Sequence, residues 1–336
     1  MSFKRLDAED FVVSSDSITA TLWSTDSPTL TEFYTSSVQE AGSSGDFYLS
    51  VYQTGSTETN AAVQFDIAYA DAGGSGSTAY NSAVPANTPS KTVYGQYRAL
   101  ILEDENADFI FGTDTNTLTA PNFWVMSVER ARYKESLFPG SLNLTLSGSG
   151  GEIQLTDNSN DVSVNTFLGT SRVYQLVSGS NGSAITGGGY VANSGSYGLV
   201  FPDLGTILLN PAAINESIGV NADRTVGLAN GENNATLFKS IALGESITLN
   251  SQETITSDYI FIRSRNSEFN YSENPTFISG STGEIIYTDF INNPQTYITT
   301  VGMYNDSNEL LAVAKLSRPL VKDFTKESLV RVKLDF

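Results

Sequence analysis

The stretch Phe123-Trp-Val-Met-Ser-Val128 is apolar at almost every position, so a strand formed here would bury both of its faces. Tyr259-Ile-Phe-Ile262 has the same character. The run Val63-Gln-Phe-Asp-Ile-Ala-Tyr69 instead places Val, Phe, Ile and Tyr at every second position, the period of a strand with one buried face. The first two stretches predict central strands covered on both sides, and the third predicts a half-buried strand.

Other segments repeat the period of two. Leu142, Leu144 and Leu146 share one face, and the closing residues 330–336 place Val, Val, Leu and Phe on one face and Arg, Lys and Asp on the other. Tyr297 to Tyr304 and Glu309 to Leu316 form a predicted hairpin, because four turn-forming residues separate them. Turn residues separate such runs at short intervals, as in sandwiches and barrels.

Helical signals are few. Ser27 to Gly42 contains a cap, a proline in the first turn and a glycine stop, and Asn234 to Leu243 ends at Gly244. Arg98 to Leu102 has the composition of a strand. The sequence therefore predicts a mainly β chain with antiparallel β-sandwich-type domains and one or two short helices.

A chain of 336 residues is longer than one hydrophobic core usually serves. A polar stretch from Thr113 to Asn122, ended by Pro121, is a candidate boundary. We therefore expect an N-terminal β domain over residues 1–120. A second β domain over residues 121–336 would be closed by a basic C-terminal strand.

The composition excludes several classes of protein. There are 18 Lys and Arg against 37 Asp and Glu, a net charge of −19, and there is neither Cys nor His. Disulfides, thiolate zinc sites and His-based triads are therefore impossible, and the acidity argues against nucleic acid as a partner. No apolar run approaches the roughly 20 residues of a membrane span. Acidic residues before Phe11 also argue against a secretory leader.

The basic residues gather near the C-terminus. Residues 315–336 have a net charge of +3, which leaves −22 for the rest of the chain. These cations either line a solvated strand edge or form a contact surface for an acidic neighbour, such as another copy of the chain. The candidate interface residues are Lys315, Arg318, Lys322, Lys326, Arg331 and Lys333.

Motifs that would carry chemistry are weak. Glu103-Asp-Glu-Asn-Ala-Asp108 offers four carboxylates for a hard cation, but a solvated strand end explains it better. Asp157 to Asp161 and Asp114 to Asn116 lack the glycine and glutamate of a calcium loop. No Ser-Lys pair stands in a convincing setting. We therefore predict no catalytic residue, no metal and no cofactor, although a pair of distant carboxylates for glycan cleavage stays open.

Four segments carry a resemblance to known proteins: Arg130 to Leu146, with its Phe-Pro-Gly-Ser turn, Ser196 to Asn210, Glu268 to Thr276, and Thr296 to Leu316. In this order they resemble structural proteins from the tails of contractile-tailed, T4-like bacteriophages, particularly those of marine cyanobacteria. The four segments span residues 130 to 316. A fainter likeness lies in Met1-Ser-Phe-Lys-Arg-Leu-Asp7 and in Val93 to Tyr97.

The resemblance implies a non-enzymatic virion protein of the phage tail, first of all a baseplate wedge subunit, assembled in the host cytoplasm. Its partners would be other tail and baseplate proteins, with a homo-oligomer expected and neither nucleic acid nor membrane involved. The alternatives are a receptor-binding fibre or capsid decoration protein and, third, a glycan-cleaving tail enzyme.

Overall fold

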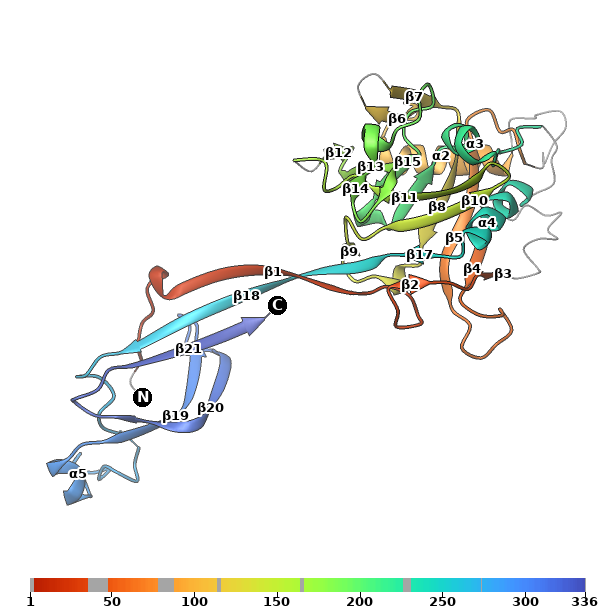
Figure 1. Ribbon diagram of the computed structural model, residues 1–336. Helices are drawn as coiled ribbons and strands as arrows, with labels where there is room; N and C mark the ends of the chain where they lie inside the picture. The colour runs from red at the N-terminus through yellow and green to blue at the C-terminus, as the bar shows by residue number, and fades with distance from the viewer. Residues whose placement is uncertain are drawn as a thin grey trace. The chain divides into compact units, whose positions relative to one another are not determined.

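The computed structural model describes residues 3–35, 48–77, 88–113, 116–163, 166–225, 231–272 and 274–335 (Figure 1). The chain is mainly β, with 44% of its residues in strands and 17% in helices, which confirms the predicted fold class. It divides into two compact units. Unit 1 comprises Met1–Ser17 and Thr254–Phe336, and unit 2 comprises Ile18–Glu253.

Unit 2 is built around a thirteen-stranded sheet, whose main path runs β2-β17-β10-β11-β13-β15-β16-β8-β5-β4-β3, with β12 and β14 pairing to β13. Its strands are β2 (Thr29–Leu30), β3 (Tyr34–Thr35), β4 (Leu49–Tyr52), β5 (Val63–Asp71), β8 (Asn122–Val128), β10 (Asn143–Gly148), β11 (Gly151–Asp157), β12 (Thr166–Leu168), β13 (Ser171–Ser180), β14 (Ser183–Ala184), β15 (Gly198–Phe201), β16 (Thr206–Leu209) and β17 (Ile247–Thr248).

The central strand β8 pairs with β5 on one side and with β16 on the other. Its alternate residues enter two separate cores, so that Trp124 and Met126 lie in one and Phe123 and Val125 in the other. All four side chains are fully buried. The prediction of a central strand covered on both faces is confirmed for this stretch.

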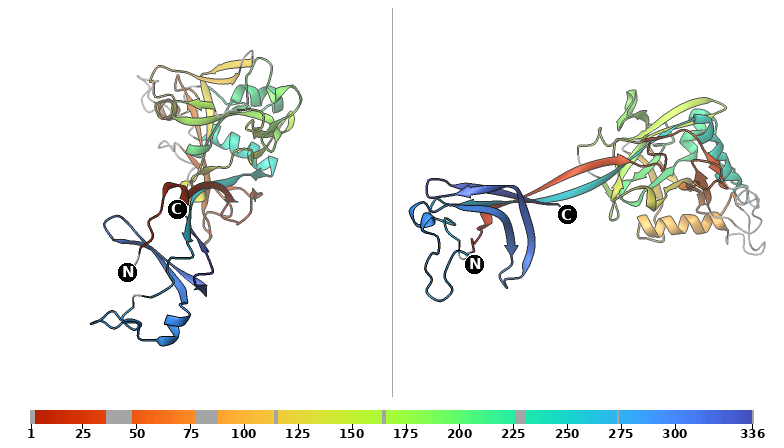
Figure 2. Two further views of the ribbon diagram at one scale, coloured as in Figure 1. Left: turned by 90° about the vertical axis from the view of Figure 1, so that its left-hand side faces the viewer. Right: turned by 90° about the horizontal axis from the view of Figure 1, so that it is seen from below.

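Three helices cover the faces of the sheet. α3 (Pro211–Ile218) and α4 (Glu232–Gly244) contribute to the first core, and α2 (Pro89–Ile101) contributes to the second core together with the hairpin of β6 (Phe109–Thr113) and β7 (Asn116–Ala120). Figure 2 shows α2 and α4 on opposite sides of the sheet. Unit 2 is therefore a layered β structure with apolar packing on both faces of its central strands.

Two secondary-structure assignments made from the sequence need correction: one predicted helix and one strand-like run. Ser27 to Gly42 does not form a helix in its described part, because Thr29 and Leu30 pair with Thr248 and Ile247 of β17, while residues 36–42 lie outside the described residues. The strand-like run 98–102 belongs to the end of α2, whose buried face repeats at helical spacing. The helix predicted before Gly244 is confirmed as α4, but α2 and α3 were not predicted.

The two units do not follow the boundary expected between residues 120 and 121. Strands from both sides of it pair directly, since β5 lies beside β8 over seven residue pairs from Phe65–Val128 to Asp71–Asn122. Separating them would expose both cores. The chain instead passes between the units at Ser17 and at Thr254.

Unit 1 combines the two ends of the described chain. Its main sheet has the order β1-β18-β21, and a separate two-stranded sheet is the predicted hairpin, here formed by β19 and β20 (Figure 1). β9 pairs with the part of β18 that lies in unit 2. The remaining elements are the short helix α5 (Thr288–Asn292) and the strands β1 (Phe11–Thr21), β9 (Ser136–Leu137), β18 (Asn250–Ser264), β19 (Thr296–Tyr304), β20 (Leu310–Lys322) and β21 (Ser328–Asp335).

Short 3-10 helices complete the chain. They are Ala8–Asp10, Arg130–Arg132, Thr186–Gly189 and Pro202–Leu204.

Close backbone packing in unit 2 gives a first prediction. A Cβ atom on Gly198 of β15 would lie 1.9 Å from the carbonyl oxygen of Leu208, so Gly198→Ala forces the paired strands apart. We expect a loss of about 1–3 kcal/mol in the free energy of unfolding, measured by urea denaturation.

The matched control is Gly95→Ala in α2, where a Cβ would meet nothing within 4 Å. Alanine is a better helix former than glycine, so this change should stabilise the protein by about 0.5–1 kcal/mol. Equal effects of the two substitutions would contradict the packing described for β15 and β16.

Candidate interaction surface

The described part of unit 1 buries very little apolar surface. Only Ile260 of β18 and Val332 of β21 are buried hydrophobic residues there, and neither large apolar core of the protein contains a residue of unit 1. The other buried residues of this unit are polar: Ser257, Ser264, Asn270, Lys322, Asp323 and Ser328. Since apolar burial is the main favourable term in folding, the interior of unit 1 supplies little stability.

The apolar side chains of unit 1 are instead on its surface. Of the 23 exposed large apolar side chains among the described residues, 16 belong to unit 1 and only 7 to the much larger unit 2. Those of unit 1 are Phe3, Phe11, Val12, Val13, Tyr271, Ile285, Ile286, Tyr287, Ile291, Tyr297, Tyr304, Leu310, Leu311, Val313, Phe324 and Leu329. Apolar exposure of this density is typical of surfaces that bind other proteins.

Strand β18 shows the same imbalance. The sequence predicts a strand covered on both faces at residues 259–262, and the structure does place β18 between β1 and β21. However, only Ile260 is buried, while Tyr259, Phe261 and Ile262 keep part of their surface exposed. A strand whose sequence suits full burial is thus incompletely covered by the described chain.

One face of the hairpin of β19 and β20 is also exposed, while alternate residues on the other face are only partly buried. The two strands pair only with each other among the described residues, and a two-stranded sheet alone is marginally stable in water. The exposed fractions of Tyr297, Leu311 and Val313 are 62%, 66% and 59%. The free edges and these side chains suit pairing with a further strand.

Lys322, one of the six candidate interface cations, is buried and does not lie on a surface as the sequence predicts. Lys322 has 0% exposure, and its Nζ donates to the carbonyl oxygens of Asn266 and Asp323 at 3.1 and 3.0 Å and to Oδ1 of Asn270 at 2.7 Å. All three acceptors are neutral, and they satisfy the three donors of an ammonium group. Lys322 therefore holds the 266–270 segment to the end of β20 and is not an interface residue in this structure.

The other five cations lie on the surface. Lys326 pairs with Asp323 at 3.2 Å, Lys333 pairs with Asp335 at 2.8 Å, and the guanidinium of Arg331 lies 5.6 Å from the ring centre of Tyr259. Lys315 and Arg318 on β20 are exposed and form no ion pair with a described residue. These two are the cations that remain open to a partner.

The acidic clusters behave as turns in the described chain. Residues 103–108 follow α2 and not a strand, and Asp104 there accepts a hydrogen bond from the backbone N–H of Asn106. The carboxylate of Asp157 accepts from the backbone N–H groups of Gly140 and Ser159. Among the residues described, no group of three or more acidic side chains could hold a metal ion.

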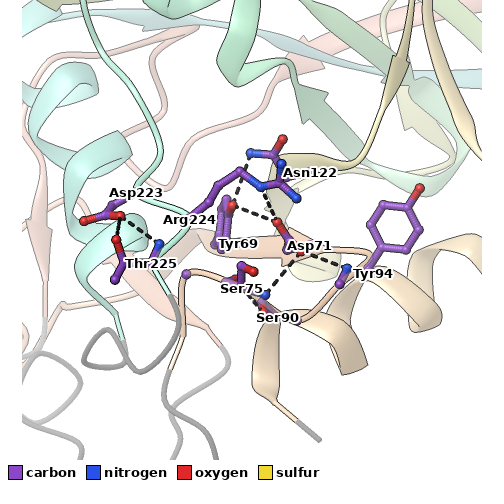
Figure 3. A network of polar contacts seen from close by, with 12 residues as sticks. Tyr69, Asp71, Ser75, Ser90, Tyr94, Asn122, Asp223, Arg224 and Thr225 are labelled. Atoms are coloured by element: carbon purple, nitrogen blue, oxygen red, sulfur yellow. Dashed lines mark hydrogen bonds and ion pairs between the residues drawn. The ribbon is translucent and has the colours of Figure 1, made fainter. Parts of the chain in front are cut away.

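A buried carboxylate, Asp71 at the end of β5, lies at the centre of a polar network in unit 2 (Figure 3). Its Oδ1 accepts from the backbone N–H groups of Gly73 and Ser75, and its Oδ2 accepts from Nε of Arg224 at 2.8 Å. Burial chiefly raises the pKa of the neighbouring Tyr69, whose hydroxyl also accepts a hydrogen bond from Asn122. Because both oxygens of Asp71 are engaged by donors, the network fixes the loop after β5.

Asp66 of β5 comes closest to a catalytic carboxylate. Burial raises its pKa, the hydroxyl of Ser50 lowers it, and the charge of Glu129 raises it further. Its Oδ1 is buried without a hydrogen-bond partner in the described chain. Two nearby carboxyl groups, one with a raised pKa, are what a glycan-cleaving site needs. Sequence reasoning had no ground to choose this pair, because Asp66 lies on β5 and Glu129 follows the end of β8, far away along the chain.

None of the helices in the described ranges has the length and apolar character needed to cross a membrane. Comparisons with protein-family models, with curated proteins and with solved structures found no match to this chain.

The buried cation gives a second prediction. Lys322→Met keeps roughly the size of the side chain but removes its three hydrogen bonds and leaves the buried Oδ1 of Asn270 without this donor. The carbonyl oxygens of Asn266 and Asp323 keep Nδ2 of Asn270 and the N–H of Lys326 as donors. We therefore expect a loss of about 1–3 kcal/mol in the stability of unit 1. Hydrogen exchange of the amides in residues 266–270 and 320–323 of the full chain measures this loss.

Lys315→Met on the same strand is the control, because Lys315 is exposed. It should change stability by no more than about 0.5 kcal/mol. Unchanged exchange in the Lys322→Met chain would show that the three hydrogen bonds do not hold the 266–270 segment.

Asp66 gives a third prediction, for pH dependence. Because its pKa is raised in the folded chain, the charged carboxylate costs stability at neutral pH, and this cost disappears as the pH falls below the unfolded pKa. Asp66→Asn should therefore stabilise the protein at pH 7, and the gain should shrink with acidification. Urea unfolding at several pH values measures it, with the exposed Glu152→Gln as control. A gain that does not change with pH would contradict the assignment.

Proposed function

We propose that this protein is a non-enzymatic structural subunit of a bacteriophage tail, most specifically a baseplate wedge component, which acts through interfaces with other subunits. The observation that carries the proposal is the composition of unit 1, with two buried hydrophobic residues and sixteen exposed large apolar side chains among its described residues. A unit of this kind gains its stability by covering those side chains with a partner.

The resemblance of four segments to phage tail proteins supports the choice of particle. Two of these segments, at residues 130–146 and 196–210, form strands and turns of unit 2, and the other two belong to unit 1. The segment from Thr296 to Leu316 contains most of the exposed hairpin of β19 and β20. The resemblance thus extends to the part of the chain that we assign to assembly.

Charge is distributed in a way that suits the same role. Unit 1 has 10 basic and 14 acidic residues, a net charge of −4, whereas unit 2 has 8 basic and 23 acidic residues, a net charge of −15. Like charge keeps unit 2 surfaces apart. Contacts between subunits are therefore favoured at unit 1, where opposite charges are interspersed with apolar side chains.

A glycan-cleaving tail enzyme is the second candidate, and the raised pKa of Asp66 beside Glu129 is the observation that favours it. Hydrolysis of host polysaccharide by the purified protein, lost on Asp66→Asn, would promote this candidate above the structural one.

The fourth prediction concerns location. We expect antibody against this chain, detected by immunogold electron microscopy, to label the distal end of tails in phage particles purified on a density gradient. Particles treated with pre-immune serum are the control.

Label on fibres or heads would keep the structural class but favour the receptor-binding or decoration alternative. Antigen that stays only in the soluble fraction would overturn the proposed function.

A further inference from the structure

Two exposed segments of unit 1 carry opposite charge next to apolar residues. The first is the start of β1, where Phe11, Val12 and Val13 are all exposed, at 45%, 49% and 66%, directly after Asp7 and Asp10. Consecutive residues of a strand point to opposite faces, so both faces of β1 are uncovered here. β1 is also an edge strand of its sheet among the described residues.

The second segment is the middle of β20. Leu311 and Val313 are exposed there, and Lys315 and Arg318 follow them on the surface. β20 pairs with β19 alone among the described residues, which leaves its other edge open. Each segment therefore has backbone groups without a strand partner, apolar side chains without cover, and a charged end.

We propose that β1 of one copy pairs with β20 of a second copy in an antiparallel arrangement, and that this contact joins subunits of this chain. Antiparallel pairing brings the acidic end of the first segment to the basic end of the second. When Val12 lies opposite Val313, Asp10, the residue directly before β1, lies opposite Lys315. Asp7 stands at the start of the short 3-10 helix Ala8–Asp10 and adds a second negative charge to the same end of the segment. The charge pattern thus selects both the direction and the register.

The partner is a second copy because one chain carries both complementary segments and uses neither for the other. Within a copy, β1 pairs with β18 and β20 pairs with β19. A contact between two different surfaces of identical subunits is heterologous, so it repeats from subunit to subunit and forms a ring or an open filament. This inference rests on the proposed structural role and names the partner of unit 1.

The test uses charge exchange on the full chain. Sedimentation velocity should show concentration-dependent oligomers of the natural protein. Reversing the basic end, with Lys315→Glu and Arg318→Glu together, should weaken association about tenfold or more. Reversing the acidic end, with Asp7→Lys and Asp10→Lys, should do the same. Mixing the two variants should restore oligomers, because acidic β1 then meets basic β20 and basic β1 meets acidic β20.

The absence of cysteine from the chain allows a direct test of register. Val12→Cys and Val313→Cys chains, mixed and then oxidised, should form a disulfide-linked heterodimer, because facing residues of paired strands lie within disulfide reach. Leu243→Cys on unit 2, an equally exposed position, replaces either partner as the control and should give no specific product.

The outcomes separate this inference from the proposed function. A natural chain that stays monomeric at its highest soluble concentration, yet is found in tails by immunogold labelling, overturns self-pairing and leaves the structural role standing. Oligomers that the mixed charge variants fail to restore also overturn the pairing. If mixing restores the oligomers but immunogold labelling finds no chain in the particles, the pairing is supported and the role in the tail is refuted.

Discussion

The central strand β8 (Asn122–Val128) packs against an apolar core on each of its two faces, and unit 2 is organised around this strand. Its Trp124 meets Tyr69 edge to face in the core closed by α3 and α4, and the indole Nε1 donates to the carbonyl oxygen of Asn233 at 2.9 Å. Its Phe123 packs at a tilt against Tyr94 of α2 and meets Phe109 of β6 edge to face. Because one strand contributes to both cores, the layers on either side of the sheet cannot separate without exposing aromatic side chains.

Unit 1 also contains a strand segment that is apolar on both faces, but this segment is not covered by helices in the described chain. Residues 259–262 of β18 are apolar on both faces, like β8, but no helix of eight residues or more lies in the described part of unit 1. Polar contacts take the place of a core, above all the three hydrogen bonds of Lys322, the ion pair of Lys4 with Glu268 at 2.9 Å, and the hydrogen bond from Ser257 to Asp335. A net hydrogen bond contributes only about 0.5–1.5 kcal/mol, whereas burying one large apolar side chain contributes about 1.5–3 kcal/mol. Covering a few of the sixteen exposed side chains would outweigh these contacts.

Local patterns in the sequence predicted what depends on neighbours along the chain. The period of two correctly places Phe65 and Ile67 in the core, the double-sided run identifies β8, and the turn residues before Glu309 define the hairpin of β19 and β20. Features that depend on distant partners were missed. Two of the three acceptors of Lys322 lie more than 50 residues earlier, at Asn266 and Asn270. Unit 1 is formed by two segments that no shift in composition connects.

The weak interior of unit 1 bears on the order of assembly. A domain with a large apolar core would fold before it met a partner, and its interface would only add stability to a structure that is already folded. Unit 1 has no such core in its described residues, so ordering of its strands and docking share the same apolar side chains. Part of the free energy of contact then offsets the conformational entropy that unit 1 loses as it becomes ordered, and this lowers the affinity between isolated subunits. In the particle that we propose, several such contacts would form together, and their combined effect would exceed that of each contact alone. A subunit of the kind that we propose would associate weakly when free and would be held firmly only where neighbouring sites are already in place.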